Sequence, residues 1–294
     1  MKKEIGLGLM RIADMEVSDV KELIVCALDN GVNFFDHADI YGQRRSEEKF
    51  GLVLKENKDL RKKMVIQTKC GICKGYYDLS KEHIIKQVLE SIRLLNCDYI
   101  DILLLHRPDA LVDYNEVNEA FNYLYDNGLV KEFGLSNCSS MQISLYNKYL
   151  DHKVKYNQVQ LSIVHSHLIS QGIFFNMNES EAVARTDFLI EYSMLNDIKL
   201  QAWSPVMASW EDGTFIDNPK YAKLNQELEV LAKKYNVEKN AIALAWILRH
   251  PANIMPIVGT TSKRHLLEMV KATNIHLTRE EWYGLYLASG HKLP

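Results

Sequence analysis

The chain has 294 residues, of which 47% are hydrophobic and 25% charged, and a formal net charge of -3. Such a composition supports a large buried core and excludes a disordered protein, and the charge gives no basic field that would attract nucleic acid. No apolar signal segment follows Met1 and no run approaches ~18 apolar residues, so we expect a cytoplasmic protein without a membrane partner.

Apolar runs and helix-periodic segments alternate along the whole chain. Strands are expected at 5–10, 32–35, 64–68, 99–105, 130–135, 159–161, 199–203 and 254–258. Helices are expected at 20–28, 46–54, 81–95, 117–125, from 141, and at 182–195, 222–235 and 262–271, with extra helical segments at 241–248 and 280–288. An irregular segment of about twenty residues is expected to follow the sixth strand and to run to 179, and a loop is expected over 204–218.

Eight strands that alternate with helices over the full length predict an α/β protein with a closed (β/α)8 barrel, the TIM barrel, and extra helices near the C-terminus. No linker or repeat interrupts the pattern, so residues 1–294 are expected to form a single domain. In such barrels the chemistry lies at the carboxyl ends of the strands. The oligomeric state does not follow from the sequence, and a monomer is compatible with it.

The five cysteines are an odd number in a chain without an export signal, which favours reduced thiols over a disulfide framework. Cys70 and Cys73 have the spacing of a redox motif. No second pair completes a zinc site, and the order of elements is not that of a thioredoxin. A chance spacing is therefore favoured, and a redox role stays open.

Titratable side chains follow three successive apolar strands. Asp36 comes directly after the second strand, Lys69 directly after the third and His106 directly after the fourth, while Tyr41 lies in the loop beyond Asp36. In a closed barrel these strand ends meet at one rim, so the four side chains should lie together. An Asp that caps a turn, or a Tyr that fills a gap, would be an ordinary structural residue if it stood alone. Core packing does not generate four titratable residues of different types at successive strand ends.

The four side chains suit the reduction of a carbonyl group. A phenol is a poor acid near neutral pH. An ammonium such as that of Lys69 would favour the phenolate of Tyr41 and make the phenol a better proton donor, and Asp36 would keep the ammonium charged. The imidazole of His106 could hydrogen-bond a carbonyl oxygen as negative charge grows there.

The chain resembles the aldo-keto reductases, which are NAD(P)H-dependent (β/α)8 barrels with an Asp, Tyr, Lys and His tetrad. The resemblance covers nearly the whole length and rests on residues 31–42, on Gln-Thr-Lys-Cys-Gly around Lys69 and on Leu-Leu-Leu-His-Arg-Pro-Asp around His106. It implies that the protein reduces an aldehyde or ketone by hydride transfer, with Tyr41 as the general acid. The substrate itself is not written in the sequence.

The resemblance also implies the residues that bind the cofactor. Ser136, Asn137 and Gln158 would hydrogen-bond the nicotinamide carboxamide, and Trp203 would stack on the nicotinamide ring, with a buried indole as the weaker alternative for Trp203. Further cofactor contacts are implied along two segments: Ser204, Pro205 and Val206 beside the pyrophosphate, and Gly259, Thr261, Lys263 and His265 around the adenosine phosphates, with Glu268 at the adenine.

Two departures from the family pattern concern the choice of cofactor. Some relatives have a Lys where this chain has Gly259 and an Arg where it has His265. Lys263 and Arg264 still place two cations where a 2′-phosphate would lie, although a solvated helix start explains them almost as well. NADPH is the expected cofactor, with NADH as the alternative.

Three other interpretations stay open. A metal-dependent barrel hydrolase could use Asp36, His37 and His106 with His165 and His167 as ligands, but it would have no use for Tyr41 beside Lys69, and we expect no metal. A regulatory or redox-sensing subunit that only binds the cofactor would share the fold. A Rossmann dehydrogenase is disfavoured because Gly6-Leu7-Gly8 lacks the third glycine.

Overall fold

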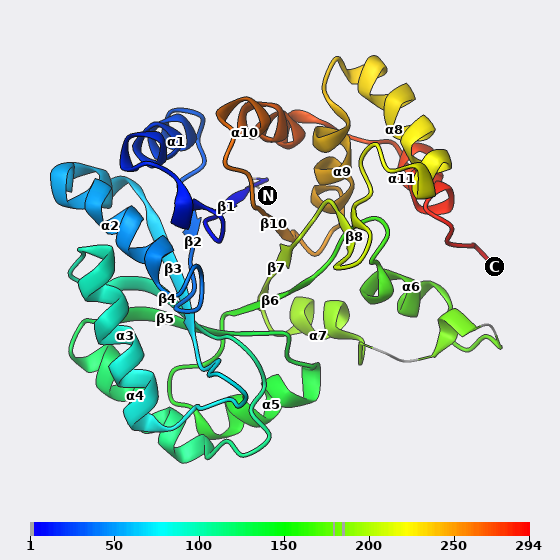
Figure 1. Ribbon diagram of the computed structural model, residues 1–294. Helices are drawn as coiled ribbons and strands as arrows, with labels where there is room; N and C mark the ends of the chain where they lie inside the picture. The colour runs from blue at the N-terminus through cyan, green and yellow to red at the C-terminus, as the bar shows by residue number, and fades with distance from the viewer. Residues whose placement is uncertain (1–2, 179, 184–185) are drawn as a thin grey trace. The chain divides into compact units, whose positions relative to one another are not determined.

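The computed structural model describes residues 3–178, 180–183 and 186–294 (Figure 1). Eight parallel strands close into a barrel in the order β1-β10-β7-β6-β5-β4-β3-β2. Their bounds are β1 Gly6–Gly8, β2 Phe34–Asp36, β3 Val65–Cys70, β4 Ile100–Leu105, β5 Val130–Ser136, β6 Tyr156–Gln160, β7 Lys199–Trp203 and β10 Met255–Val258. The expected (β/α)8 barrel is confirmed.

The α-helices are α1 Val17–Asp29, α2 Arg45–Glu56, α3 Lys81–Leu95, α4 Tyr114–Asp126, α5 Ser140–Tyr149, α6 His167–Ile173, α7 Leu189–Leu195, α8 Ala222–Tyr235, α9 Lys239–Leu248, α10 Lys263–Val270 and α11 Arg279–Ala288. Short 3₁₀ helices span Ile12–Asp14, Lys58–Lys63, Ser180–Ala182, Pro219–Tyr221 and Lys271–Asn274. None of the helices in the described ranges has the length and apolar composition needed to cross a bilayer.

The chain divides into two compact units. The first contains Val159–Val258, Arg264–Pro294 and the N-terminal segment that ends at Ile5; the second contains Gly6–Gln158 and Gly259–Lys263. The four candidate catalytic residues, Asp36, Tyr41, Lys69 and His106, all lie within the second unit. The expectation of a single domain over residues 1–294 stays a prediction.

In the second unit, consecutive strands pair in parallel and the helices between them pack side by side on the outside (Figure 1). The register places Asp36 opposite Gln67 and Ser136 opposite Gln158. β4 is buried along most of its length, as its run of Ile and Leu predicts. These pairings bring the carboxyl ends of β2, β3 and β4 to one edge.

Local sequence signals set the helix ends near the site. Ser80 caps α3, since its side chain accepts a hydrogen bond from the backbone N–H of His83, and Asn96 ends the helix in the left-handed conformation. Gly51 allows α2 to approach α3 closely, because a Cβ at this position would lie 1.8 Å from the carbonyl oxygen of Leu94.

In the first unit, β7 pairs with β10, while α8, α9 and α11 form the group of helices seen beside the C-terminus in Figure 1. Trp246 of α9 and Trp282 of α11 stack with ring centroids 4.7 Å apart. Each indole N–H donates to the backbone carbonyl of the other residue. The extra helices near the C-terminus are thus fastened to one another by paired aromatic side chains, which satisfies both buried donors.

Three sequence-based expectations about secondary structure were wrong. The segment from 162 to 178 is not wholly irregular, because α6 lies within it. The helix expected at 182–195 begins only at Leu189, where Phe188 takes the left-handed conformation; residues 184 and 185 lie outside the described ranges. The loop 204–218 contains a small antiparallel pair, β8 Met207–Ser209 and β9 Gly213–Thr214.

Candidate active site

The centre of the site is a buried ion pair between Asp36 and Lys69. Both residues lie inside their strands, Asp36 as the last residue of β2 and Lys69 as the next to last of β3. The Nζ of Lys69 lies 2.7 Å from Oδ1 and 2.8 Å from Oδ2 of Asp36, and it also donates to the carbonyl oxygen of His37 at 2.8 Å. The lysine is fully buried.

The environment of Lys69 keeps it protonated. Burial alone would lower the pKa of Lys69, but the carboxylate of Asp36 and the hydroxyl of Tyr41 more than offset this, and the pKa is raised. The site therefore holds a fixed ammonium at neutral pH. The side-chain amides of Gln67, at 2.6 Å, and Gln158, at 3.0 Å, donate to Oδ1 of Asp36 and hold the carboxylate in place.

Tyr41 is the third member of this group. Its hydroxyl accepts a hydrogen bond of 3.1 Å from the Nζ of Lys69. Burial raises the pKa of Tyr41, Lys69 lowers it, and Asp36 and Asp39 raise it further, with a net increase. Lys69 thus acts in the direction that the sequence predicts, but burial outweighs it.

His106 completes the set at the end of β4. Its ring meets the ring of Tyr41 edge to face, with centroids 6.1 Å apart. Burial, together with the charges of Lys69 and Arg107, holds the pKa of His106 well below its ordinary value, so the imidazole is neutral. Its Nδ1 is buried and has no hydrogen-bond partner among the described residues. The structure thus brings Asp36, Tyr41, Lys69 and His106 together.

Three of the expected nicotinamide ligands lie beside this group in the second unit. The hydroxyl of Ser136 donates to the carbonyl oxygen of Gln158 at 2.9 Å and accepts from the side-chain amide of Asn137 at 2.8 Å. Asn137 has a φ of 58°, a left-handed conformation that Asn tolerates. Hydroxyl and amide groups of this kind have the donors and acceptors that a carboxamide needs, so these residues fit a nicotinamide.

The other expected cofactor residues form two local groups. Trp203, at the end of β7, is partly buried, and its ring centroid lies 6.3 Å from that of Trp210. Ser204 has a φ of 51° and begins the turn into β8, and its carbonyl oxygen accepts from the N–H of Met207. Pro205 is buried, and the carbonyl oxygen of Val206 accepts from Thr214.

In the adenosine segment most of the charged side chains are already paired. Lys263 forms an ion pair with Glu22, and Arg264 one of 2.5 Å with Glu238. His265 contacts Arg264, and Glu268 pairs with Lys271 at 2.6 Å. The carbonyl oxygen of Gly259 accepts from Arg11, and Thr261 is exposed. These pairs are solvent-facing, and exposed ion pairs are weak and exchange readily.

Sequence reasoning missed two side chains that contact the tetrad or its loop. Gln67 lies two residues before Lys69 on β3, and side chains two apart on a strand point to the same face. The alternation of side chains along β3 therefore signals that Gln67 shares a face with Lys69, where it hydrogen-bonds Asp36. Asp39 lies between Asp36 and Tyr41, its side chain is buried, and its backbone N–H donates to the carbonyl oxygen of Lys69 at 3.0 Å.

Among the described residues, no three His, Cys, Asp or Glu side chains are gathered so that they could hold a metal ion. The cysteines, including Cys70 and Cys73, are free thiols. Cys73 lies 3.8 Å from Nε2 of His83, and burial raises the pKa of Cys73, so its thiolate is disfavoured.

Comparison with known proteins supports the same class. The model of the Aldo/keto reductase family matches residues 4–285. The chain is 32% identical to the oxidoreductase YdhF of Escherichia coli, over 98% of this chain and 94% of that protein. It is 30% identical to a 6-dehydroglucose reductase of Agrobacterium fabrum, over 97% and 94% of the two chains.

The fold also matches solved structures. The crystal structure of an aldo/keto reductase from Klebsiella pneumoniae in complex with NADP and acetate superposes with a TM-score of 0.72 at 21% identity, covering 96% of this chain and 89% of that one. The barrel and these relatives define an oxidoreductase that depends on a nicotinamide cofactor. The chain belongs to the aldo/keto reductase family.

Proposed function

We propose that the protein reduces an aldehyde or ketone to an alcohol with NADPH, and that Tyr41 donates the proton. The observation that carries the proposal is the position of the Lys69 ammonium. It lies 2.7 Å from the carboxylate of Asp36 and 3.1 Å from the hydroxyl of Tyr41. A phenol held against a fixed cation has its charged form stabilised as it loses its proton, which is what a general acid requires.

Each member of the group then has one role. Asp36 holds Lys69 charged and in place, and Lys69 stabilises the developing phenolate of Tyr41. His106, as a neutral imidazole, orients the substrate by donating a hydrogen bond to the carbonyl oxygen. When it is bound, the nicotinamide supplies the hydride. Ser136, Asn137 and Gln158 would orient its carboxamide and Trp203 would stack on its ring.

The preference for NADPH rests on Lys263 and Arg264. A 2′-phosphate would replace Glu22 and Glu238 as the acceptor of their hydrogen bonds, and exposed ion pairs cost little to exchange. Gly259 and Thr261 would border the phosphates with Ser204, Pro205 and Val206, while His265 and Glu268 would border the adenosine. The lack of a cation at 259 reduces the expected preference, with NADH as the alternative.

The variant Tyr41→Phe tests the proposal. It removes the hydroxyl and leaves the ring against His106. Turnover should be followed by NADPH oxidation with a panel of aldehydes and ketones that includes 6-dehydroglucose, after which one Agrobacterium relative is named. We expect turnover to fall by at least ~100-fold, the usual contribution of a positioned acid, with the dissociation constant for NADPH unchanged. Tyr123→Phe, on the exposed part of α4, is the matched control.

Near-normal turnover in Tyr41→Phe would refute the role of Tyr41. A parent protein that binds NADPH tightly and turns over none of the carbonyls would instead favour the regulatory or redox-sensing subunit. Hydrolytic activity that a chelator abolishes would favour the metal-dependent hydrolase. The three outcomes are distinct because they are measured with different substrates and additives.

A further inference from the structure

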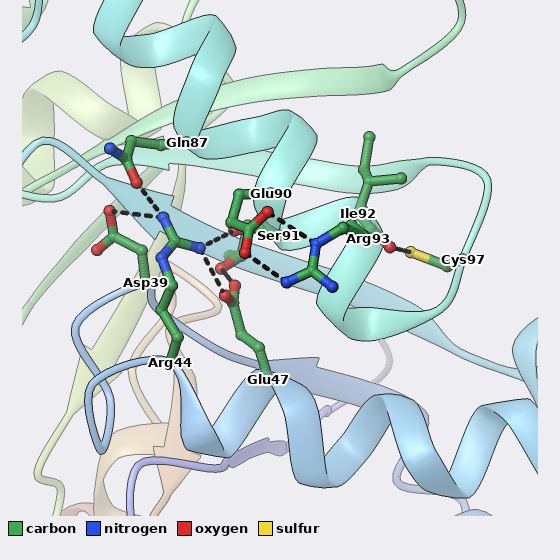
Figure 2. A network of polar contacts seen from close by, with 10 residues as sticks. Asp39, Arg44, Glu47, Gln87, Glu90, Ser91, Ile92, Arg93 and Cys97 are labelled. Atoms are coloured by element: carbon green, nitrogen blue, oxygen red, sulfur yellow. Dashed lines mark hydrogen bonds and ion pairs between the residues drawn. The ribbon is translucent and has the colours of Figure 1, made fainter.

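A second group of buried charges lies next to the loop that carries Tyr41. Arg44, at the start of α2, extends between Asp39 and Glu47, and Figure 2 shows Gln87 and Ser91 of α3 facing the same guanidinium. Asp39 is 6% exposed and Glu47 is fully buried. Gly51 makes the arrangement possible, because it lets α3 come close enough to α2 for Gln87 and Ser91 to reach Arg44.

The guanidinium of Arg44 is shared unequally between the two carboxylates. Its Nη1 lies 3.1 Å from Oε2 of Glu47. Its Nη2 hydrogen-bonds Gln87 and lies farther away from Asp39, at 3.9 Å from Oδ2. Glu47 also accepts a hydrogen bond of 2.7 Å from the hydroxyl of Thr68. The Oδ1 of Asp39 is buried and has no partner among the described side chains. Asp39 is therefore the poorly compensated carboxylate of the two.

This imbalance changes the protonation of Asp39. Burial raises the pKa of Asp39 to about 7, and Glu47 adds to the shift, while Arg44, a backbone hydrogen bond from Ile40 and the charge of Lys69 oppose it. Near neutral pH the carboxyl group thus passes between a charged and an uncharged state. A buried carboxylate whose counter-ion lies as far away as 3.9 Å is expected to behave in this way.

Asp39 is also placed to influence the site. It lies between Asp36 and Tyr41, and its backbone N–H donates to the carbonyl oxygen of Lys69 at 3.0 Å. Its negative charge raises the pKa of Tyr41. The other charged or titratable groups around it are Arg44 just before α2, Glu47 on α2, Lys69 and Cys70 on β3, and Cys73 beyond β3. Asp39 itself, two residues before Tyr41 in the chain, has a pKa close to neutrality.

We propose that Asp39 is a positioning residue whose charge, set by its unequal share of Arg44, adjusts how readily Tyr41 gives up its proton. This inference rests on the proposed function of Tyr41 as the general acid. When Asp39 takes up a proton, a negative charge that raises the pKa of Tyr41 is lost and the phenolate becomes easier to form. The reduction of a carbonyl should therefore become faster as the pH falls through neutrality.

The test compares Asp39→Asn with Glu48→Gln. Asn has nearly the shape of the protonated Asp, and Glu48 is an exposed residue of α2 whose replacement changes the net charge by the same amount. At saturating NADPH and substrate, we expect the turnover number of the parent to rise as the pH falls from 8 to 6, because a stronger general acid transfers its proton faster. Asp39→Asn should keep the higher rate throughout, and Glu48→Gln should follow the parent.

A second measurement does not depend on turnover. The phenol of Tyr41 can be titrated by ultraviolet absorbance. Subtracting the titration curve of Tyr41→Phe from that of the parent isolates the signal of Tyr41, and the same subtraction is made in the Asp39→Asn background. We expect the midpoint for Tyr41 to be lower in the Asp39→Asn background. A merely structural role of Asp39 would lower the melting temperature without moving this midpoint.

An unchanged midpoint overturns the inference, whatever the activity of the variant. A pH step in turnover that persists in Asp39→Asn overturns it as well. The proposed function fails by a different result, which is normal turnover in Tyr41→Phe. In that event the titration still decides whether the charge of Asp39 acts on the phenol.

Discussion

Replacing Lys69 with Met should destabilise the protein strongly, because it leaves a buried carboxylate without its counter-ion. The side chains of Lys69 and Asp36 are 0% and 3% exposed. After the replacement, Oδ1 of Asp36 keeps only the neutral amides of Gln67 and Gln158. Removing one partner of a buried ion pair typically costs about 3–5 kcal/mol, and we expect a loss of this size in the free energy of unfolding.

The assay is urea unfolding near pH 7, with the parent and each variant extrapolated to water. Two comparisons make it specific. Lys62 and Asp59 form a pair 4.0 Å apart that is 85% and 96% exposed, so Lys62→Met should change the free energy of unfolding by less than ~1 kcal/mol. Adding Asp36→Asn to Lys69→Met should recover most of the loss, because Asn carries no charge and its oxygen can still accept from Gln67.

The pH dependence provides a further check. The pKa of Lys69 is raised in the folded protein above its ordinary value of 10.5, so its stabilising contribution is complete below that value and is lost as the pH rises through the folded pKa. The parent should lose this contribution in the alkaline range, and Lys69→Met should not. A single variant as stable as the parent, or a double variant no more stable than the single one, would refute the reasoning.

Two further predictions concern His37 and the cofactor. Burial, with the charge of Lys69, lowers the pKa of His37 to about 3, so the folded state excludes a proton that the unfolded state binds below pH 6.5. In the parent, this proton lowers the free energy of unfolding by about 1.4 kcal/mol for each pH unit between pH 6.5 and about 3, and His37→Leu should abolish this part of the slope. Unfolding at a series of pH values measures the slope, and an unchanged slope in the variant would contradict the prediction. We also expect NADPH to bind roughly tenfold more tightly than NADH at low salt, and Lys263→Ala with Arg264→Ala to bring the two dissociation constants together. Equal affinities in the parent, measured by fluorescence titration, would rule out this assignment.

The sequence was sufficient for the barrel because its elements are locally consistent. The helix expected at 81–95 is α3 to the residue, and the one at 222–235 is α8, since each has an apolar stripe and ends at an Asn in the left-handed conformation. The strand at 99–105 was clear because its run of Ile and Leu is buried in the barrel wall.

The chain beyond β6 was harder to predict because its structure depends on contacts distant in sequence. α6 has only seven residues, and Ser166 before it provides no side-chain cap; Ser166 instead contacts His291, 125 residues away. The β8–β9 pair has strands of three and two residues, which are too short for a period-two pattern to stand out.

The positions of the four tetrad side chains could be predicted, but the balance of charge around them could not. Strand ends alone place Asp36, Lys69 and His106 at one edge. The contacts of Arg44 with Gln87 and Ser91 depend on the close approach of α2 and α3 at Gly51, a tertiary contact that no local pattern encodes. For the same reason, the sequence indicated that Lys69 would lower the pKa of Tyr41 and gave no sign that burial would outweigh it.

That balance bears on what Tyr41 can do. A proton donor must hold its proton at the pH where it works, and the raised pKa of Tyr41 ensures that the phenol is protonated near neutrality. Lys69 does not create a phenolate in the resting site; it lowers the cost of forming one when a substrate oxygen takes the proton. Burial and the two nearby aspartates raise that cost and Lys69 limits it, so in the proposed reduction the phenol meets the substrate oxygen with its proton in place.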